Sequence, residues 1–366
     1  MNSRKAAFAF CASILLCLAG SAQAQKAPYP VVQGKYYKFE KIADGVYYAS
    51  PELNGTSFPF GSNPFFGSNL VVIVNKDDVV LVDSPTTPRA AHALLADIKI
   101  LTSKPVRTVI NTHWHYDHTD ANSVFGPEVQ IIAHDYVRQA IEKFDILNNE
   151  PFRSSHRNSG PTLIARFTKQ IAAEKDQVRK AALQKNLVDA QAALKEFVGD
   201  IKAIKPTPPN VTYNNRLVLH RGSREIQLHF LGRGHTGGDT VVFLPKERIV
   251  ATGDLMESRL AYMGSAFFDE WIKTLGALNR LDWAVTLPGH GVPFTDKGLV
   301  TAYQAYLRDV MAQVAKLRAA GVSADEAAKR VDMRAHAKSF PDIEDVGAEV
   351  RGIRRLYAWM DETGRK

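Results

Sequence analysis

Four separate stretches of the chain share one pattern, an apolar run that ends just before a histidine or an aspartate. The runs at residues 106–110, 225–231, 249–251 and 283–287 precede His113, His235, Asp254 and His290. Short apolar runs bounded by turn residues are typical of buried strands. Glycines flank the last three of these side chains, and glycine lets the backbone turn sharply beyond a strand. The pattern therefore predicts a fold whose strand ends bring these side chains to a shared centre.

The first of these sites is the densest. His113-Trp114-His115-Tyr116-Asp117-His118 places four metal-ligand side chains within six residues. Zinc takes about four nitrogen, sulfur or oxygen ligands, at roughly 2.0–2.2 Å for nitrogen and oxygen. A histidine-rich surface turn is the alternative, but only 11 histidines occur in the whole chain, and three fall here. We predict these metal ligands: His113, His115, Asp117, His118, His235, Asp254 and His290.

Strand patterns alternate with helical ones along the chain, which is typical of an α/β fold. Residues 70–74 and 79–82 predict a hairpin, and residues 88–101 have helical apolar spacing. His134 follows another strand pattern at 130–133, and we interpret it as a structural strand-end histidine rather than an eighth ligand.

Two helical regions stand outside this alternation. Residues 135–210 contain a long Ala-, Lys-, Gln- and Glu-rich stretch at 163–204, which predicts a helical insertion that serves as a lid or brace. Residues 299–366 carry narrow apolar stripes at 300–317 and 346–360, with a capping box of Ser323 and Glu326 between them. We divide the chain into segments 1–24, 25–298 with the insertion, and a helical extension at 299–366.

The first 24 residues have the pattern of a signal peptide. Arg4 and Lys5 precede an apolar run at 6–18, and Ala22-Gln23-Ala24 is typical of a cleavage site. The run is too short to span a bilayer. Cys17 follows Leu16 rather than a small residue, which argues against a lipid anchor. We therefore expect cleavage near Ala24, a periplasmic or secreted protein, and no membrane anchor.

Composition narrows the chemistry. Both cysteines, Cys11 and Cys17, lie in the expected signal, so the mature chain has no thiolate ligand and no cysteine nucleophile. The formal charge of +8 becomes +6 without Arg4 and Lys5. The chain has no long run of one charge sign, so we interpret the excess as a solvated basic surface and expect no nucleic-acid partner.

The order His-x-His-x-Asp-His, His, Asp, His after successive strands resembles the metallo-β-lactamase superfamily over roughly residues 36–294. The resemblance implies an αββα sandwich of two β-sheets with helices outside. It also implies that His113, His115 and His235 hold one metal. In the same way, Asp117, His118 and His290 hold a second metal, and Asp254 bridges the two.

The resemblance further implies the chemistry. Two zinc ions would lower the pKa of a shared water enough for hydroxide to form near neutral pH, and that hydroxide would attack the substrate. Asp117 would orient or deprotonate the nucleophile. Asp83 resembles the family's acidic residue behind the ligands and would orient a ligating imidazole, although an ordinary turn aspartate remains the alternative.

The sequence constrains the substrate less than it constrains the metal ligands. The expected export and the aromatic segment 54–67, a candidate flap, favour a class B β-lactamase. Asp254, where many such lactamases have cysteine, favours the wider group of thioesterases, lactonases and related hydrolases. We expect a small-molecule substrate with an amide, lactone, ester or thioester bond, and name Arg233, Tyr262 and Asn122 as candidate contacts. A monomer and a homodimer both remain open.

Other classes of function remain as alternatives. The same scaffold holds iron in flavodiiron proteins and persulfide dioxygenases, so an iron-dependent redox enzyme is the second hypothesis. The chain has no flavin-binding segment of the flavodiiron kind, which favours zinc and hydrolysis over iron. A metal-binding protein without catalytic turnover is a third hypothesis, and the complete ligand set argues against it. A nuclease is opposed by the expected export.

Overall fold

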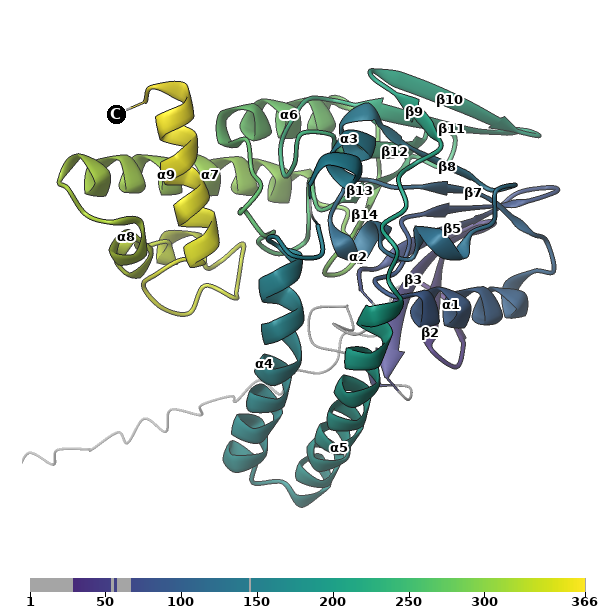
Figure 1. Ribbon diagram of the computed structural model, residues 1–366, viewed down its shortest axis with the longest axis horizontal. Helices are drawn as coiled ribbons and strands as arrows, with labels where there is room; N and C mark the ends of the chain where they lie inside the picture. The colour runs from purple at the N-terminus through teal and green to yellow at the C-terminus, as the bar shows by residue number, and fades with distance from the viewer. Residues whose placement is uncertain (1–28, 54–55, 58–66, 145, 366) are drawn as a thin grey trace, which may run out of the picture.

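The structure is a computed structural model that describes residues 29–53, 56–57, 67–144 and 146–365. The expected signal segment and most of the candidate flap at 54–67 lie outside the described residues. Two β-sheets form the centre of the described chain, and helices lie on their outer faces (Figure 1).

The first sheet has nine strands in the order β1-β2-β3-β5-β6-β7-β8-β9, with β4 paired to β3. Their bounds are β1 (Val31–Gln33), β2 (Tyr37–Ala43), β3 (Val46–Leu53), β4 (Thr56–Ser57), β5 (Leu70–Val74), β6 (Val79–Val82), β7 (Val106–Ile110), β8 (Gln130–His134) and β9 (Val211–Tyr213). The hairpin predicted at 70–82 is confirmed, since Val71 pairs with Val82 and Val74 with Val79. From β6 to β9 the strands run parallel.

The second sheet has five strands in chain order. They are β10 (Arg216–Arg221), β11 (Arg224–Phe230), β12 (Thr240–Leu244), β13 (Ile249–Gly253) and β14 (Val285–Pro288). The last pair, β13 and β14, is parallel, so the chain leaves both strands at the same edge of the sheet.

Alternation along the strands builds a core on each side of the first sheet. In β6, Val80 and Val82 face the second sheet and pack with Leu228 and Val242. Val79 and Leu81 of the same strand face outward and pack with Leu94 of α1 (Pro88–Leu101). Successive strand side chains point to opposite faces, and here both faces are apolar because both are covered.

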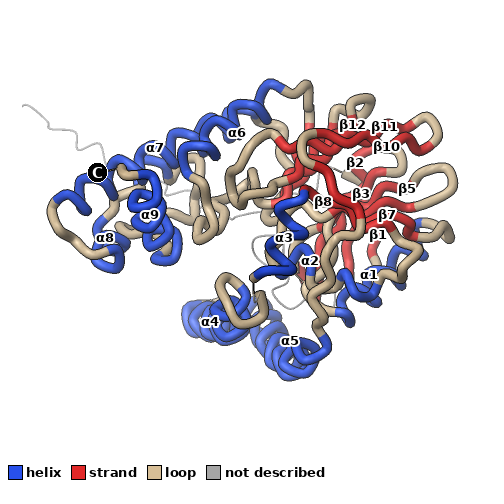
Figure 2. Tube along the Cα trace, turned by 45° about the horizontal axis from the view of Figure 1, so that its top comes forward, coloured by secondary structure: helices blue, strands red, loops and turns tan. Residues whose placement is uncertain are grey.

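The remaining helices cover the outer faces or project from them (Figure 2). Their bounds are α2 (Tyr116–Thr119), α3 (Asp135–Lys143), α4 (Phe152–Ala173), α5 (Gln177–Asp200), α6 (Phe268–Arg280), α7 (Lys297–Ala319), α8 (Ala324–Arg330) and α9 (Val350–Thr363). With α1 outside one sheet and α6 and α7 outside the other, the αββα sandwich predicted from the sequence is confirmed.

The predicted helical insertion contains a pair of long helices. Helices α4 and α5 lie side by side and extend away from the sheets (Figures 1 and 2). The chain reverses at residues 174–176, where the side chain of Asp176 caps α5 by accepting from the Arg179 backbone N–H. Phe197 of α5 packs on the outer core of the first sheet, so the hairpin is anchored at its base.

The tail helices pack as the apolar stripes predicted. Ser323 caps α8, as the capping box indicates. Helix α9 begins at Val350 behind its cap Glu349, so the stripe predicted from 346 starts too early, and Val346 is exposed. Among the helices that the structure describes, none combines the length and the apolar character that a bilayer crossing needs.

Candidate metal centre

The predicted ligands come from five places along one edge of the sandwich. His113 and His115 follow β7, and His115 precedes α2, which carries Asp117 and His118. His235, Asp254 and His290 follow β11, β13 and β14. Because strands fix the start of each loop, these side chains are held on a rigid frame. All seven are brought together in two adjoining groups.

The first group consists of His113, His115, His235 and Asp254, all buried. His235 Nε2 lies 3.0 Å from His115 Nδ1 and 3.6 Å from Asp254 Oδ2. His113 Nε2 lies 3.8 Å from the same Asp254 oxygen. Three imidazole nitrogens and one carboxylate oxygen therefore face a common point.

The second group consists of Asp117, His118 and His290. His290 Nε2 lies 3.0 Å from Asp117 Oδ2, and His118 Nε2 lies 3.7 Å from it. Asp254 lies between the groups, with Oδ1 3.3 Å from His118 Nε2 and Oδ2 3.5 Å from His290 Nε2. One carboxylate is thus shared by both sets of nitrogens.

These residues fit a pair of divalent cations. A tetrahedral site with bonds of roughly 2.0–2.1 Å places its ligand atoms about 3.3 Å apart, close to the separations seen here. His113 Nε2, His118 Nε2 and Asp254 Oδ1 are buried without a hydrogen-bond partner in the described chain. Buried polar atoms normally have a partner. A cation in each group would satisfy them.

The three histidines of the first group are held neutral. Burial lowers the pKa of His113 and His115 well below the ordinary value. Burial also lowers the pKa of His235 to about 4, although Asp254 opposes the shift. A neutral imidazole has a lone pair to give to a metal.

The carboxylates are held ionised in spite of burial. His118 and His290 together lower the pKa of Asp117 to about 2. The same two histidines hold the pKa of Asp254 well below its ordinary value. Burial opposes charge on His118 and His290, but Asp254 and Asp117 raise the pKa of both imidazoles. The centre without cations thus pairs negative carboxylates with protons that a metal would displace.

Asp83 supports the second group from behind. Its Oδ2 lies 2.8 Å from His118 Nδ1, and its Oδ1 accepts from the Thr112 backbone N–H at 2.7 Å. The Thr112 hydroxyl donates to Asp83 at 2.9 Å and lies 3.1 Å from His113 Nδ1. Asp83 and Thr112 therefore orient one imidazole of each group, so Asp83 is not an isolated turn aspartate.

The His290 loop is fastened to the first sheet. The Tyr48 hydroxyl donates to the carbonyl of Pro288 at 2.8 Å, and the Asn69 backbone N–H donates to the carbonyl of Gly289 at 2.7 Å. A Cβ on Gly289 would lie 2.3 Å from Asp254 Oδ1 and 2.8 Å from His118 Cε1. Only glycine lets this backbone approach the two ligands so closely.

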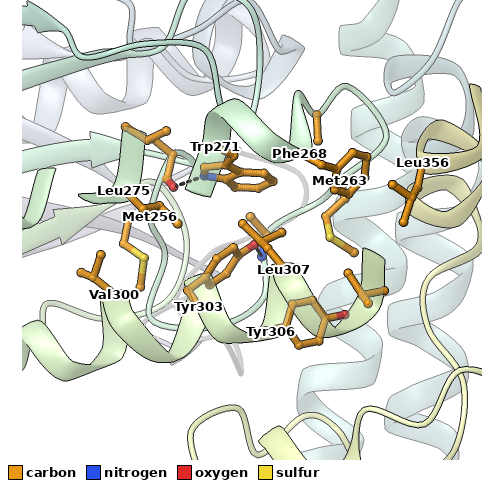
Figure 3. Close-up of a cluster of buried hydrophobic side chains, with 14 of the residues drawn as sticks. Met256, Met263, Phe268, Trp271, Leu275, Val300, Tyr303, Tyr306, Leu307 and Leu356 are labelled. Atoms are coloured by element: carbon orange, nitrogen blue, oxygen red, sulfur yellow. Dashed lines mark hydrogen bonds between the residues drawn. The ribbon is translucent and has the colours of Figure 1, made fainter. Parts of the chain in front are cut away.

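A loop at residues 254–267 borders the first metal group. Trp271 Nε1 donates to the carbonyl of Leu255, and Tyr303 accepts from the Ala261 N–H, so the core of α6 and α7 holds the loop from below (Figure 3). Ser265 Oγ lies 3.1 Å from His115 Nε2. The Tyr262 ring lies edge-on to His115 with centroids 5.7 Å apart, which places this predicted contact residue beside the centre.

Asn122 does not fit its predicted role. Its side chain is fully buried, and its amide is bonded to Ser84, Asn111 and the carbonyl of Thr207. The amide oxygen accepts twice and the nitrogen donates twice, which uses its full capacity. In the described structure, the Asn122 side chain ties the ligand loop to neighbouring loops instead of facing the metal centre.

Two further predicted residues lie in other contacts. The Arg233 guanidinium is paired with both oxygens of Glu270 and stacks on the Phe267 ring at 4.2 Å, so the structure gives it a partner other than a substrate. His134 accepts from the Tyr136 N–H and contacts the carbonyl of Asn214 through its other nitrogen. Both ring nitrogens of His134 are therefore used, as expected of a structural histidine.

Three residues that support the ligands are not evident from the sequence pattern. Thr112 lies next to His113, and its place between a strand and the ligand motif was the available signal. Tyr48 lies 65 residues before His113, its nearest ligand in sequence, and Ser265 lies 11 residues after Asp254. Nothing in a single sequence distinguishes them from other strand tyrosines and loop serines.

Comparison with known proteins places this geometry in a family. The model of the metallo-β-lactamase superfamily matches residues 63–290. The chain is 22% identical over 297 residues to a linear primary-alkylsulfatase of Pseudomonas sp. (strain ATCC 19151), covering 77% of this chain and 53% of that protein. It is 23% identical over 240 residues to the probable metallo-hydrolase YqjP of Bacillus subtilis (strain 168), covering 63% of this chain and 69% of that protein.

The chain thus spans about half the length of the alkylsulfatase that it matches. Among solved structures, it superimposes on a metallo-β-lactamase from Pontibacter korlensis with a TM-score of 0.51 and 18% identity. The superposition covers 75% of this chain and 99% of that one. At this identity, the likeness is one of fold.

Proposed function

The chain belongs to the metallo-β-lactamase superfamily, and we propose that it is a hydrolase that works with two divalent cations. The observation that carries this proposal is the meeting of seven buried or nearly buried His and Asp side chains in two groups that share Asp254. His113, His115 and His235 would hold one cation, and Asp117, His118 and His290 the other.

When bound, such cations polarise a substrate oxygen and lower the pKa of water. The chain's own residues prepare that chemistry. The buried imidazoles of the first group are neutral, so they are ready to bind a cation. The ionised carboxylate of Asp117 orients a water molecule or accepts its proton. The Tyr262 ring packs edge-on against His115 beside this group.

We propose zinc as the metal. The donors are imidazole nitrogens and carboxylate oxygens, a set that suits zinc and that binds iron as well. Metal analysis of protein purified without added metal is the direct measurement. Zinc near two equivalents per chain supports the proposal, whereas iron together with oxygen consumption would favour the redox alternative.

The proposed reaction is hydrolysis of an amide, lactone, ester or thioester bond in a small molecule. The name of the alkylsulfatase relative adds sulfate esters to this range. A panel tests the bond type: a chromogenic cephalosporin, a carbapenem, an acyl-homoserine lactone, a glutathione thioester and a primary alkyl sulfate. Turnover of one class at least a thousandfold above the others identifies the substrate class. No turnover by the dizinc protein contradicts the proposal.

We also propose export, which rests on the basic, apolar and small-residue pattern of residues 4–24. Expression with the native N-terminus in a Gram-negative host tests it. Recovery from the periplasm with Gln25 as the first residue supports export, and cytoplasmic protein that retains Met1 or Asn2 contradicts it.

A further inference from the structure

A cavity of about 520 Å³ lies beside the first metal group. Two of its lining residues contact the same predicted ligand. The Trp114 ring packs against His115 with centroids 4.7 Å apart, and Ser265 Oγ lies 3.1 Å from His115 Nε2. The cavity therefore adjoins the metal group, with Trp114 and Ser265 at the boundary between them.

Of the other five lining residues, Phe144 and Ile146 are apolar, whereas Lys143, Asn149 and Glu150 are polar or charged. Ile146 is 3% exposed and Trp114 is 7% exposed, and both belong to the small core beneath α3. Phe144 is different, since 45% of its surface is exposed while its ring packs on Trp114 with centroids 5.7 Å apart. Exposed aromatic surface at the mouth of a hollow is typical of a binding site for small molecules.

The polar groups lie toward the mouth. Lys143, Asn149 and Glu150 line the cavity and are exposed. Lys143 is the last residue of α3, and the segment that joins α3 to α4, where the helical insertion begins, supplies Phe144, Ile146, Asn149 and Glu150. The insertion thus supplies one wall of the hollow next to the metal group, while the sandwich supplies the other through Trp114.

We propose that this cavity binds an apolar alkyl or aryl group of the substrate, with the scissile bond placed at the metal centre next to His115. This inference rests on the proposed function and names its substrate class. The volume lies in the range of about 300–1,000 Å³ that is usual for small-molecule sites. Phe144, Ile146 and Trp114 are the specificity-determining residues.

The test uses straight-chain alkyl hydroxamates, whose head group binds zinc and whose tail extends by one methylene at a time. Their Kd values are measured by calorimetry on the dizinc protein. Affinity should rise about three- to fourfold per methylene, the factor that corresponds to ~0.8 kcal/mol per buried CH₂, until the cavity is filled. Phe144→Ala should flatten this dependence, and Asn149→Trp should end it at a shorter chain.

Ile100→Ala is the matched control, because Ile100 is also a large exposed apolar side chain, 56% exposed, but lies on α1. It should leave the chain-length dependence unchanged. A wild-type protein that binds no hydroxamate, or binds all of them equally, overturns the subsite. If the protein turns over a panel substrate but its hydroxamate affinity does not depend on chain length, the subsite is contradicted and the hydrolase proposal is not. If hydroxamate affinity depends on chain length but no panel substrate is turned over, the hydrolase proposal is contradicted and the apolar site is supported.

Discussion

Asp83 Oδ2 lies 2.8 Å from the Nδ1 atom of His118, on the side of the imidazole away from the other ligands. Asp83 also has a positive φ of 69°, a left-handed conformation that asparagine and aspartate tolerate better than most residues. A short carboxylate on a fixed turn therefore sets the ring orientation and the tautomer of His118. Asp83 acts through His118 as a positioning residue.

Asp83→Asn should weaken zinc binding at the second group by about 10- to 100-fold, because the amide keeps the backbone conformation but loses the charge that holds the imidazole. Competition with a chromophoric chelator measures the two affinities separately. The control is Asp78→Asn, since Asp78 is also largely buried but is paired with Arg221 and Asn75 in the turn between β5 and β6. Equal zinc affinities in wild type and Asp83→Asn would contradict this role.

His115→Ala should remove hydrolytic activity and lower the bound zinc from two to about one per chain, while the fold stays intact. The ligand precedes α2 in a loop beyond β7, so its loss removes a nitrogen donor rather than a core side chain. Metal content, activity and far-UV circular dichroism are measured on the same sample. Global unfolding of the variant would show that the metal is structural instead.

Gly289→Ala should disrupt the centre more than its single added methyl suggests. The new Cβ would meet Asp254 Oδ1 at 2.3 Å and His118 Cε1 at 2.8 Å, so the shared carboxylate has to move. We expect a loss of ~1–3 kcal/mol in stability and at least a tenfold weaker zinc affinity. Gly199→Ala is the control, because a Cβ there meets nothing within 4 Å and alanine suits a helix. Similar zinc affinity in both variants would refute the steric argument.

Much of this centre follows from the sequence alone. Apolar runs followed by His113, His235, Asp254 and His290 predict strand ends, and strand ends in a sandwich meet at an edge. The periodicity of residues 88–101 likewise predicts α1 with its observed bounds. These features are local, or they repeat one local rule at several places, so one sequence is enough to find them.

Other features depend on packing between distant segments. The break between α4 and α5 does not follow from the sequence, because Glu174-Lys175-Asp176 differs little in composition from the helices beside it, and only the capping by Asp176 marks it. Asn122 follows the ligand motif closely, yet Ser84, Asn111 and Thr207 bury its amide. Tertiary contacts decide which polar side chains face the substrate and which ones tie loops together.

Asp239 should give the metal-free protein a distinctive pH dependence. Burial raises the pKa of this carboxyl from 3.8 to about 7, although the Thr236 hydroxyl and backbone N–H donate to it. The folded state then binds more protons than the unfolded state between pH ~4 and ~7, so the contribution of Asp239 to stability falls as the pH rises through that window. The full effect is on the order of 4 kcal/mol, at 1.36 kcal/mol per pKa unit.

Asp239→Asn removes this titration while keeping an acceptor for Thr236. The free energy of unfolding of the variant minus that of wild type should therefore increase steadily from pH 4 to pH 7, as measured by urea denaturation in the presence of a chelator. Working with the difference cancels the titration of groups that both proteins share. A difference that is constant across this range, or that decreases with pH, would show that Asp239 is ionised in the fold.

Arg355 links the last helix to the metal centre, and its removal tests whether the tail is part of the site. Its Nε donates to the carbonyl of Ala266 at 3.0 Å, one residue beyond Ser265, which contacts His115. Arg355→Met keeps the apolar stem but loses this bond, together with an exposed pair to Glu362 on the same helix that contributes little. The loop should therefore loosen, and zinc affinity at the first group should fall about two- to tenfold, as for loss of a net hydrogen bond of ~0.5–1.5 kcal/mol.

Arg354→Met is the matched control for that variant. Arg354 neighbours Arg355 on α9 but pairs with Asp325 of α8, away from the loop. An exposed pair of this kind contributes little to stability, so zinc affinity should not change. If the two variants bind zinc alike, α9 only covers the second sheet. If Arg355→Met alone weakens the first group, the tail helps to position His115 through Ser265, although it lies more than 200 residues from that ligand in sequence.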